Sequence, residues 1–356
     1  MAKFSEVLTI VNGRNQKQVV CDDGKYPIYG SGGIMGYAND YICKAETVVI
    51  GRKGSINKPI FVETPFWNVD TAFGLCANSE KLNPKYLYYF CEKFDFEKLN
   101  TTVTIPSLTK SNLLNVEIPL PNLEKQKQIV ELLDKVTSLI SLRKQQLAKL
   151  DELVKVRFVE MFENSLWPNT SLNDICSEIV DCPHSTPKYE GNLEHPAIRT
   201  TEIKKGYIDW DSMKYVSEEE YQKRIKSLKP VPGDIVYGRE GTYGNAAIIP
   251  DGYEFCLGQR VMLFRPNKTK CISAYVLYAI LSDHVKRQAD EKNVGATVPH
   301  VNVADAKQFD VVLPPLSIQN QFAAFVERVD QQKQTVQQSL EKLELMKKAL
   351  MQEYFG

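Results

Sequence analysis

Two short segments contain residue types that could carry out chemistry, but each lacks the companion residues that the chemistry needs. Asn83-Pro84-Lys85-Tyr86 resembles the Asn-Pro-Pro-Tyr segment of adenine methyltransferases, yet Lys85 replaces the second proline and the Gly-rich loop of a cofactor site is missing. Asp290-Glu291-Lys292, with Pro250-Asp251 upstream, resembles the metal-binding acids of a nuclease, although such common residues at free spacing carry little information. Neither segment therefore predicts an active site.

Phosphate and metal sites are not indicated either. No Gly-x-x-x-x-Gly-Lys-Ser/Thr segment occurs, so ATP hydrolysis is not predicted. Gly30-Ser31-Gly32-Gly33 could cradle a phosphate, but no clear strand precedes it and no helix follows, so we interpret it as a turn. The four histidines have no ligand-like spacing to one another or to cysteines. We expect a chain without catalytic residues, bound metal or cofactor of its own.

The cysteines are scattered singly, without a Cys-x-x-Cys pair. A chain of 356 residues can bury a core without disulfide staples, so we expect reduced thiols. The residues concerned are Cys21, Cys43, Cys76, Cys91, Cys176, Cys182, Cys256 and Cys271.

Composition and charge narrow the class of protein. The chain is 43% hydrophobic and 25% charged, as in ordinary globular proteins. No apolar run approaches the roughly 20 residues of a membrane span, and the N-terminus lacks a signal-peptide core, so we expect a cytoplasmic protein. The net charge is zero, which disfavours a protein that holds DNA alone by phosphate neutralisation.

The elements that must position any functional residue are duplicated. A shift of 193 residues aligns 104–163 with 297–356 without a gap, starting from Thr104-Ile105-Pro106 and Thr297-Val298-Pro299. A second, weaker similarity at a slightly different offset relates Val49-Ile50-Gly51-Arg52-Lys53-Gly54-Ser55 to Val236-Tyr237-Gly238-Arg239-Glu240-Gly241-Thr242. The chain is therefore interpreted as two copies of one plan, each with a globular part and a tail.

The globular parts are predicted to mix helices and strands. Glu46–Gly51 and Asp234–Gly238 are predicted buried strands, and both end in Gly-Arg-x-Gly. Lys81–Lys98 and Cys271–Glu291 are predicted helices, because Tyr, Leu and Phe recur there at helical spacing. The two halves differ most upstream of these landmarks, which suggests that the copies recognise different targets.

Each tail is predicted to be one long helix. The seam positions recur at alternating steps of three and four, with Arg143, Arg157, Lys333 and Lys347 in four of them and otherwise mostly apolar residues, a heptad pattern typical of helices that pack on each other. Pro119, Pro121 and Pro314-Pro315 mark the helix starts, with Asn122 a candidate N-cap. About 40 residues give a rod of about 60 Å. The seams are Leu133, Val136, Ile140, Leu147, Leu150, Val154 and Met161, and Val326, Val329, Val336, Leu340, Leu343, Leu350 and Tyr354.

The predicted fold class is α+β, with two tandem α/β domains that are each followed by a long helix. The two helices are expected to pack as an antiparallel coiled coil with pseudo-two-fold symmetry, because equivalent seams then meet. The alternative is that each helix lies on its own domain. The predicted boundaries are 1–121, 122–163, 164–314 and 315–356.

The repeated tails and the glycine segments together resemble a known family. Ile118–Val130 and its copy Val312–Phe322 resemble the conserved regions of specificity subunits from type I restriction–modification systems. Tyr26–Gly33 and the paired Gly-Arg-x-Gly stretches resemble parts of their target-recognition domains. The resemblance extends over nearly the whole chain and follows its order, spacing and duplication.

This resemblance implies a non-catalytic subunit that binds double-stranded DNA. Each target-recognition domain would read one half of a split sequence, and the helices would set the spacer. Two modification subunits, which bind S-adenosylmethionine and methylate adenine, would dock on the chain. A restriction subunit with ATP and magnesium would complete the endonuclease. A rigid rod suits a split target, because half-sites on one face of DNA repeat every 34–36 Å or so.

Base reading usually relies on polar and basic side chains on loops that reach the major groove. Arg52 and Arg239 hold equivalent positions beside glycines, so they are equally placed to brace the fold. The predicted DNA-binding residues are Tyr29, Ser31, Arg52, Lys53, Ser55, Ser107 and Lys110 in the first domain, and His184, Ser185, Lys188, Arg199, Arg239, Tyr243, Arg260 and His300 in the second.

Partner docking is predicted at the helix starts. Gln126 and Gln319 are polar residues among apolar neighbours in both copies, so they either fix the register, bind a partner or lie on plain helix surface. An adapter that binds proteins instead of DNA is the alternative function. The predicted docking residues are Leu123, Gln126, Ile129, Leu132, Leu316, Gln319, Phe322 and Phe325.

Overall fold

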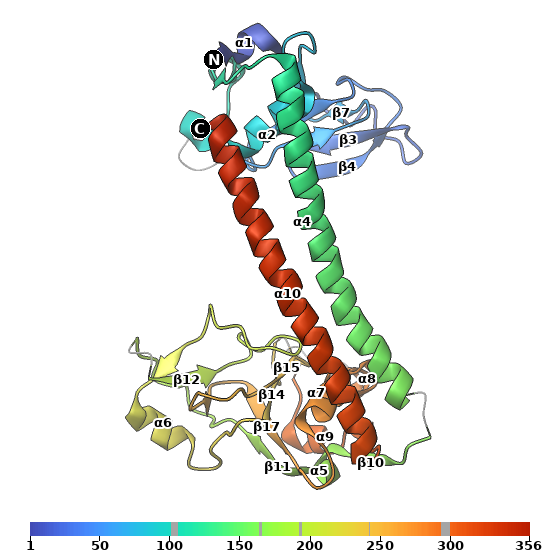
Figure 1. Ribbon diagram of the computed structural model, residues 1–356, viewed down its shortest axis with the longest axis vertical. Coiled ribbons are helices and arrows are strands. Elements are labelled where there is room, and N and C mark those ends of the chain that lie inside the picture. The colour runs from blue at the N-terminus through green and yellow to red at the C-terminus, as the bar shows by residue number, and fades with distance from the viewer. Residues whose placement is uncertain (101–105, 164–165, 192–193, 242, 293–299) are drawn as a thin grey trace. The chain divides into compact units, whose positions relative to one another are not determined.

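The computed structural model describes residues 1–100, 106–163, 166–191, 194–241, 243–292 and 300–356 (Figure 1). Two compact units make up the chain, which we call unit 1 (Met1–Gln146 with Val336–Gly356) and unit 2 (Leu147–Thr335). Each unit therefore contains one globular part and segments of both long helices. Of the repeat landmarks, Thr104-Ile105, Thr297-Val298-Pro299 and Thr242 lie outside the described residues.

The first sheet of unit 1 has the order β2-β8-β5-β6 and antiparallel neighbours. All five residues of β5 are buried, which confirms the predicted buried strand. Small and apolar side chains allow this, since the strand packs on both faces. The strands are β2 (Leu8–Asn12), β5 (Thr47–Gly51), β6 (Ile60–Val62) and β8 (Ala72–Ala77).

The second sheet of unit 1 has the order β4-β3-β7, and Gly30 pairs with Gly33 across the two-residue turn Ser31–Gly32. The glycine segment is thus a hairpin turn, as interpreted, although it follows a strand that the sequence did not reveal. The strands are β3 (Tyr26–Gly30), β4 (Gly33–Ala38) and β7 (Trp67–Asn68), and a further pair joins β1 (Ala2–Lys3) to β9 (Glu117–Ile118). The helices are α1 (Phe4–Val7), α2 (Pro84–Lys93), the 3₁₀ helix η1 (Phe96–Leu99) and α3 (Lys110–Leu114).

Unit 2 repeats this topology strand for strand. Its sheets have the orders β11-β17-β14-β15 and β13-β12-β16, with the pair β10-β18 beside them. The predicted strand at 234–238 is β14, which is wholly buried. The strands are β10 (Asn169–Ser171), β11 (Cys176–Asp181), β12 (His195–Ile198), β13 (Tyr215–Val216), β14 (Ile235–Gly238), β15 (Ala246–Ile248), β16 (Cys256–Leu257), β17 (Val261–Pro266) and β18 (Asp310–Val312). The helices are α5 (Leu172–Ile175), α6 (Glu218–Arg224), α7 (Ser273–Leu281), α8 (Asp283–Lys292) and α9 (Val303–Lys307).

The two shorter helices predicted from periodicity are each divided in the structure, which corrects the expected 81–98 and 271–291. Helix α2 ends before Phe94, whose backbone is extended, and Asp95 caps η1 by accepting from the Glu97 amide at 3.1 Å. Ser282 is likewise extended, and its Oγ accepts from the Val285 amide at 3.2 Å to start α8. A capping side chain thus restarts the chain in a new direction at both breaks.

The tails form the long helices α4 (Leu123–Phe158), continued by the π-helix η2 (Val159–Glu163), and α10 (Leu316–Phe355). The Lys125 amide donates to Asn122 Oδ1 at 2.8 Å, which confirms the predicted N-cap. Among the helices that the structure describes, none is long and apolar enough to cross a membrane.

The two long helices pack together in antiparallel fashion inside each unit. In unit 1, Leu133 shares a core with Met351 and Phe355, whereas Lys144 further along α4 pairs with Glu344 at 2.8 Å. In unit 2, Asp151 pairs with Lys333 at 2.6 Å, and the Phe158 ring lies 5.5 Å from that of Phe322. Later residues of one helix thus meet earlier residues of the other, as the heptad seams predict.

Candidate nucleic-acid interface

Three separate segments of unit 1 meet at the end of β5. The Arg52 amide donates to the Thr71 carbonyl, in the loop between β7 and β8, at 2.8 Å. The Leu108 amide donates to the Arg52 carbonyl at 2.9 Å, and the Gly54 amide donates to the Pro106 carbonyl at 3.0 Å. We call this arrangement of the β5 end, the 106–108 segment and the β7–β8 loop the unit 1 frame.

Gly51 explains how the hairpin turn joins this frame. A Cβ at this position would lie 2.4 Å from the Ser55 carbonyl oxygen and 3.1 Å from Ser31 Cβ, so a side chain does not fit. The missing side chain lets the turn at Ser31 approach the Gly-Arg-x-Gly stretch closely. Ser31, Arg52, Lys53, Ser55 and Ser107 are thereby brought to one region of unit 1, and their role in reading DNA stays a prediction.

The unit 1 frame carries positive charge that is exposed. Arg52 and Lys53 are both exposed, and no ion pair joins either of them to an acid among the residues that the structure describes. The Arg52 guanidinium lies 5.7 Å from the Phe73 ring centre, a cation–π arrangement that orients it. Exposed, unpaired cations of this kind are suited to phosphate or base edges.

Tyr29 and Lys110 both make contacts with other residues of unit 1. The Tyr29 ring packs edge-on against Phe66 at 5.4 Å and is half-buried. Lys110 Nζ donates to the Ile10 carbonyl at 2.8 Å, which ties α3 to β2. Lys110 is nevertheless exposed, so the DNA contact predicted for it stays a prediction.

Unit 2 builds the same frame from equivalent segments. The Arg239 amide donates to the Arg260 carbonyl at 2.9 Å, and the Val301 amide donates to the Arg239 carbonyl at 2.8 Å. An isolated β-bridge joins Glu240 to His300, as one joins Lys53 to Ser107 in unit 1. Thr71 and Arg260 thus hold equivalent places, before the strands β8 and β17.

The two arginines predicted to read DNA from deeper positions prove to brace unit 2. Arg239 Nε lies 3.0 Å from Asp181 Oδ1, and its side chain is largely buried. Arg199 Nε donates to Glu202 Oε2 at 3.0 Å, and Glu202 is wholly buried. Both guanidinium groups are largely buried and paired with an acid, Arg199 with a wholly buried carboxylate and Arg239 with a partly exposed one, so their predicted DNA contacts are corrected to bracing.

The other predicted residues of unit 2 differ in accessibility. His184 and Lys188 are exposed, and His184 Nε2 lies 3.9 Å from Asp181 Oδ2. The Ser185 carbonyl accepts from Arg224 Nη1 at 3.3 Å. His300 is exposed at the frame.

Tyr243 is tied to an acid. Its hydroxyl donates to Asp290 Oδ1 at 2.5 Å, and this hydrogen bond raises the pKa of the tyrosine. Asp290 is thus engaged with an aromatic hydroxyl. Within the described ranges, His, Cys, Asp and Glu side chains form no group of three that could hold a metal ion.

Sequence reasoning missed Thr71, in the loop before β8, and the acid Asp181, neither of which belongs to a motif. Arg260, in the loop before β17, was among the predicted residues, and Glu240 is the variable residue of the second Gly-Arg-x-Gly stretch. That duplicated stretch was the available signal, since the backbone of each of its arginines bonds to the loop before β8 or β17. The partner of a backbone group cannot be deduced from one strand alone.

The helix starts are joined to their domains by one buried glutamine each. Gln126 Oε1 accepts from the Asn83 amide at 2.8 Å, and Gln126 Nε2 donates to the carbonyls of Lys81 at 3.0 Å and Pro121 at 2.8 Å. Gln319 makes the equivalent three bonds, to Ile272, Lys270 and Pro314.

Both glutamines are wholly buried, so the predicted partner contact is corrected to the register-fixing alternative. Ile129 and Phe322 are also buried, and the same correction applies to them. Leu132 is 37% exposed, and Leu123, Leu316 and Phe325 are half-buried, so their docking role stays a prediction.

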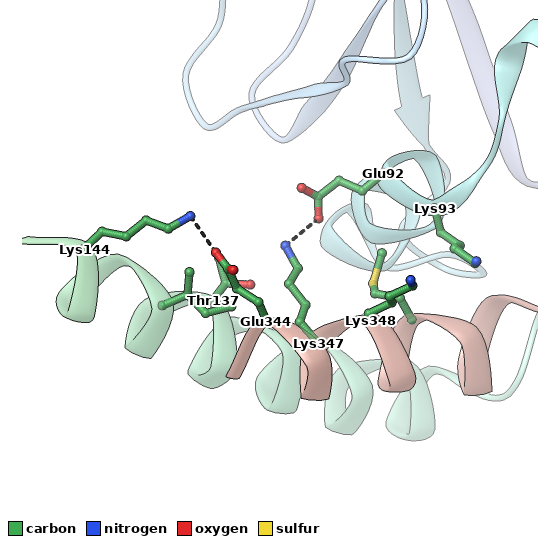
Figure 2. A pocket seen from close by; sticks show the side chains of 9 residues that line it. Glu92, Lys93, Thr137, Lys144, Glu344, Lys347 and Lys348 are labelled. Carbon is green, nitrogen blue, oxygen red and sulfur yellow. Dashed lines mark hydrogen bonds and ion pairs between the residues drawn. The ribbon is translucent and has the colours of Figure 1, made fainter. Parts of the chain in front are cut away.

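A groove of about 370 Å³ lies in unit 1 between α2 and the two long helices (Figure 2). Three of its four lysines are engaged: Lys144 pairs with Glu344 at 2.8 Å, Lys347 with Glu92 at 3.1 Å, and Lys93 Nζ donates to Gln352 Oε1 at 2.7 Å. Such pairing fits contacts that brace α2 against the helices. The lining residues are Glu92, Lys93, Thr137, Ile140, Lys144, Glu344, Lys347, Lys348 and Met351.

Comparison with known proteins identifies this architecture. The family model described as the type I restriction modification DNA specificity domain matches residues 1–152 and 165–345. The chain therefore belongs to this family of DNA-specificity proteins. Within it, the chain is a type I restriction–modification specificity subunit, a non-catalytic component of the holoenzyme.

Relatives and solved structures agree with this assignment. The type I restriction enzyme MjaVIII specificity subunit of Methanocaldococcus jannaschii is 24% identical over 86% of this chain and 75% of its own length. The EcoBI specificity subunit of Escherichia coli is 21% identical over 80% of this chain and 66% of its own. The crystal structure of the S subunit from M. genitalium shares the fold, with a TM-score of 0.61 at 15% identity, over 100% of this chain and 95% of that chain.

Proposed function

We propose that each unit reads one half of a split DNA target and that the helices set the spacer between the halves. The observation that carries the proposal is the repeated frame: backbone bonds at Arg52 and Arg239 are equivalent, whereas the side chains around them differ. A shared frame with different side chains is suited to two different half-sites. The domain boundaries at 121, 163 and 314 belong to this proposal.

Because the chain has no net charge, we propose that partner subunits supply most of the electrostatic contacts to the DNA phosphates. With 44 basic and 44 acidic residues, it has no excess charge to neutralise phosphates. Two modification subunits would supply phosphate contacts as well as S-adenosylmethionine and adenine methylation, and a restriction subunit would supply ATP-dependent cleavage with magnesium. The specificity subunit would contribute base reading.

The proposed docking surface for the modification subunits in unit 1 is an apolar stripe on α4. Leu132, Leu139 and Leu142 are exposed, and their spacing of seven and three residues places them on one helical face. Large apolar side chains in a row on a helix are typical of helix–helix docking. Leu123, Leu316 and Phe325 remain proposed docking residues at the helix starts.

The split reading is tested with the assembled complex of this chain and its modification subunits. Arg52→Ala should weaken binding to duplexes through one half-site, because it removes a cation from a single frame. Binding is measured by fluorescence anisotropy with duplexes mutated in either half, and Lys17→Ala serves as an exposed control outside the frame. Equal loss at both halves, or an isolated chain that binds as tightly as the complex, contradicts the proposal.

Docking is tested by Leu139→Glu, which places a charge on the exposed stripe. We expect the chain to fold as before and complex formation with the modification subunit to fall by about tenfold or more, because an interfacial charge would be buried unpaired. Size-exclusion chromatography measures the complex. The matched control is Ser141→Glu, which adds the same charge at an exposed position that faces away from Leu139. Unchanged assembly of the Leu139→Glu chain would refute this docking surface.

A further inference from the structure

Four charged residues of unit 2 form a chain of ionic contacts that leads from the interior to the surface. Arg239 Nε lies 3.0 Å from Asp181 Oδ1, and Arg239 Nη2 lies 3.6 Å from Glu240 Oε1. The other oxygen of the same carboxylate, Glu240 Oε2, lies 3.2 Å from Arg260 Nε. The side chains of Arg239, Glu240 and Arg260 are 12%, 28% and 67% exposed, so the last guanidinium faces solvent.

The backbone of Arg260 is also held from two sides. Its carbonyl accepts from Thr200 Oγ1 at 2.7 Å and from the Arg239 amide at 2.9 Å. Its φ of 61° lies in the left-handed region, which disfavours residues with a Cβ. Glycine would adopt this backbone conformation with less strain. The presence of arginine there instead indicates that its side chain has a role.

We propose that Arg260 reads a guanine in the half-site recognised by unit 2, with Glu240 as its positioning residue. This inference rests on the proposed function. The carboxylate lies closest to Nε, and among the residues that the structure describes no acid other than Glu240 forms an ion pair with Arg260, which leaves Nη1 and Nη2 as the remaining donor nitrogens. These two nitrogens form the fork that matches O6 and N7 of guanine in the major groove.

The positioning by Glu240 distinguishes base reading from a loose phosphate contact. A phosphate is satisfied by any nearby cation, so an arginine that serves one needs no carboxylate to orient it. A base edge demands a fixed plane and direction. The ionic contacts back to Asp181 favour one placement of the Glu240 carboxylate, because Arg239 lies between the two acids.

The unit 1 frame has no arginine at the position equivalent to Arg260. Thr71 stands in the place of Arg260, and Lys53 in that of Glu240. The guanine preference is therefore assigned to one half-site, and this asymmetry makes the inference testable within a single complex.

The experiment uses the complex of the full chain with its modification subunits and the target found from adenine methylation of host DNA. Each guanine on either strand is replaced singly by 7-deazaguanine, which lacks the N7 acceptor. One replacement, in the half-site that Arg52→Ala leaves intact, should weaken wild-type binding by about tenfold to a hundredfold. Arg260→Gly should bind the unmodified target with a similar loss and show no further loss with that analogue.

Glycine accepts the left-handed backbone, so Arg260→Gly is expected to fold, which thermal unfolding verifies. Arg260→Lys keeps the charge but loses the fork and should behave like Arg260→Gly. Thr71→Ala, at the equivalent position of unit 1, should keep the wild-type response to the analogue. Glu240→Gln should reduce the discrimination without abolishing it.

Three results would overturn the assignment: a unit 2 half-site without guanine, wild-type tolerance of every 7-deazaguanine there, or unchanged sensitivity of Arg260→Gly. Wild-type binding by Arg260→Lys would likewise overturn it in favour of a phosphate contact. Failure of the proposed function is distinguishable, because then no split target is found at all.

Discussion

At the residue scale, Glu46 holds a backbone conformation that its side chain does not favour. It is exposed, precedes β5, and has a φ of 55°. Glu46→Gly should raise the free energy of unfolding by about 0.5–1 kcal/mol, because relief of left-handed strain exceeds the extra freedom of the unfolded glycine chain. Urea unfolding measures the change. Glu46→Ala, which keeps the Cβ, should give no such gain, and a loss of stability in Glu46→Gly would contradict the argument.

The buried thiols should be unreactive for a physical reason. Burial raises the pKa of Cys271 from 9.0 to about 11, and its Sγ donates to the Ile175 carbonyl at 3.0 Å. At pH 8 only about one Cys271 in a thousand is then the reactive thiolate. Cys43, Cys91, Cys176, Cys182 and Cys256 are buried as well.

Labelling with a thiol reagent at pH 8 should therefore modify the half-exposed Cys21 and Cys76 first and the buried thiols only on unfolding. A raised folded pKa favours the protonated thiol, so the stability that Cys271 contributes is present below pH 9. It is lost as the pH rises toward about 11. Fast labelling of Cys271 in the folded chain would disprove this.

At the scale of elements, the strongest prediction concerns the glutamine that joins α4 to its domain. Gln126→Leu would remove the side chain of a wholly buried residue that accepts one hydrogen bond from a backbone amide and donates to two backbone carbonyls. We expect the free energy of unfolding to fall by about 1–3 kcal/mol. Gln319→Leu should have the same effect in unit 2.

The exposed Gln128→Leu, two residues further along α4, is the matched control and should change stability by less than about 0.5 kcal/mol. Calorimetry or urea unfolding measures all three variants. If Gln126→Leu is as stable as the control, the glutamine does not fix the helix register.

The elements that could be predicted are those with a strong local pattern. β5 and β14 follow from continuous apolar runs, and α4 and α10 follow from heptads and a capping asparagine. Short strands such as β7 could not be predicted, because a two-residue strand is defined by its distant partner β3.

The candidate site was predictable only in part for the same reason. Ser31, Arg52, Lys53, Ser55 and Ser107 of unit 1 were found through glycine motifs and duplication. Arg239 and Arg199 were misjudged, since their acids Asp181 and Glu202 are placed by tertiary packing. Charge alone does not distinguish an arginine that reads DNA from one that braces the fold. The distinction depends on whether the guanidinium is buried against an acid.

At the scale of the whole molecule, duplication explains why one chain contains two units that each use both helices. Residues 336–356 complete unit 1, whereas unit 2 is the continuous segment 147–335, so the boundaries of the units do not coincide with those of the sequence repeat. Antiparallel pairing of the helix segments inside each unit follows from equivalent seams. The arrangement suits two readers with different side chains on a common scaffold.

The central claim, two readers for one split target, is tested most directly by mapping adenine methylation across the host genome. Strains with this chain, without it, and with residues 1–121 exchanged for those of another specificity subunit are compared. The account predicts a split motif that is lost without the chain and that changes in one half after the exchange. Methylation that persists without the chain, or a single uninterrupted motif that changes as a whole, would contradict it.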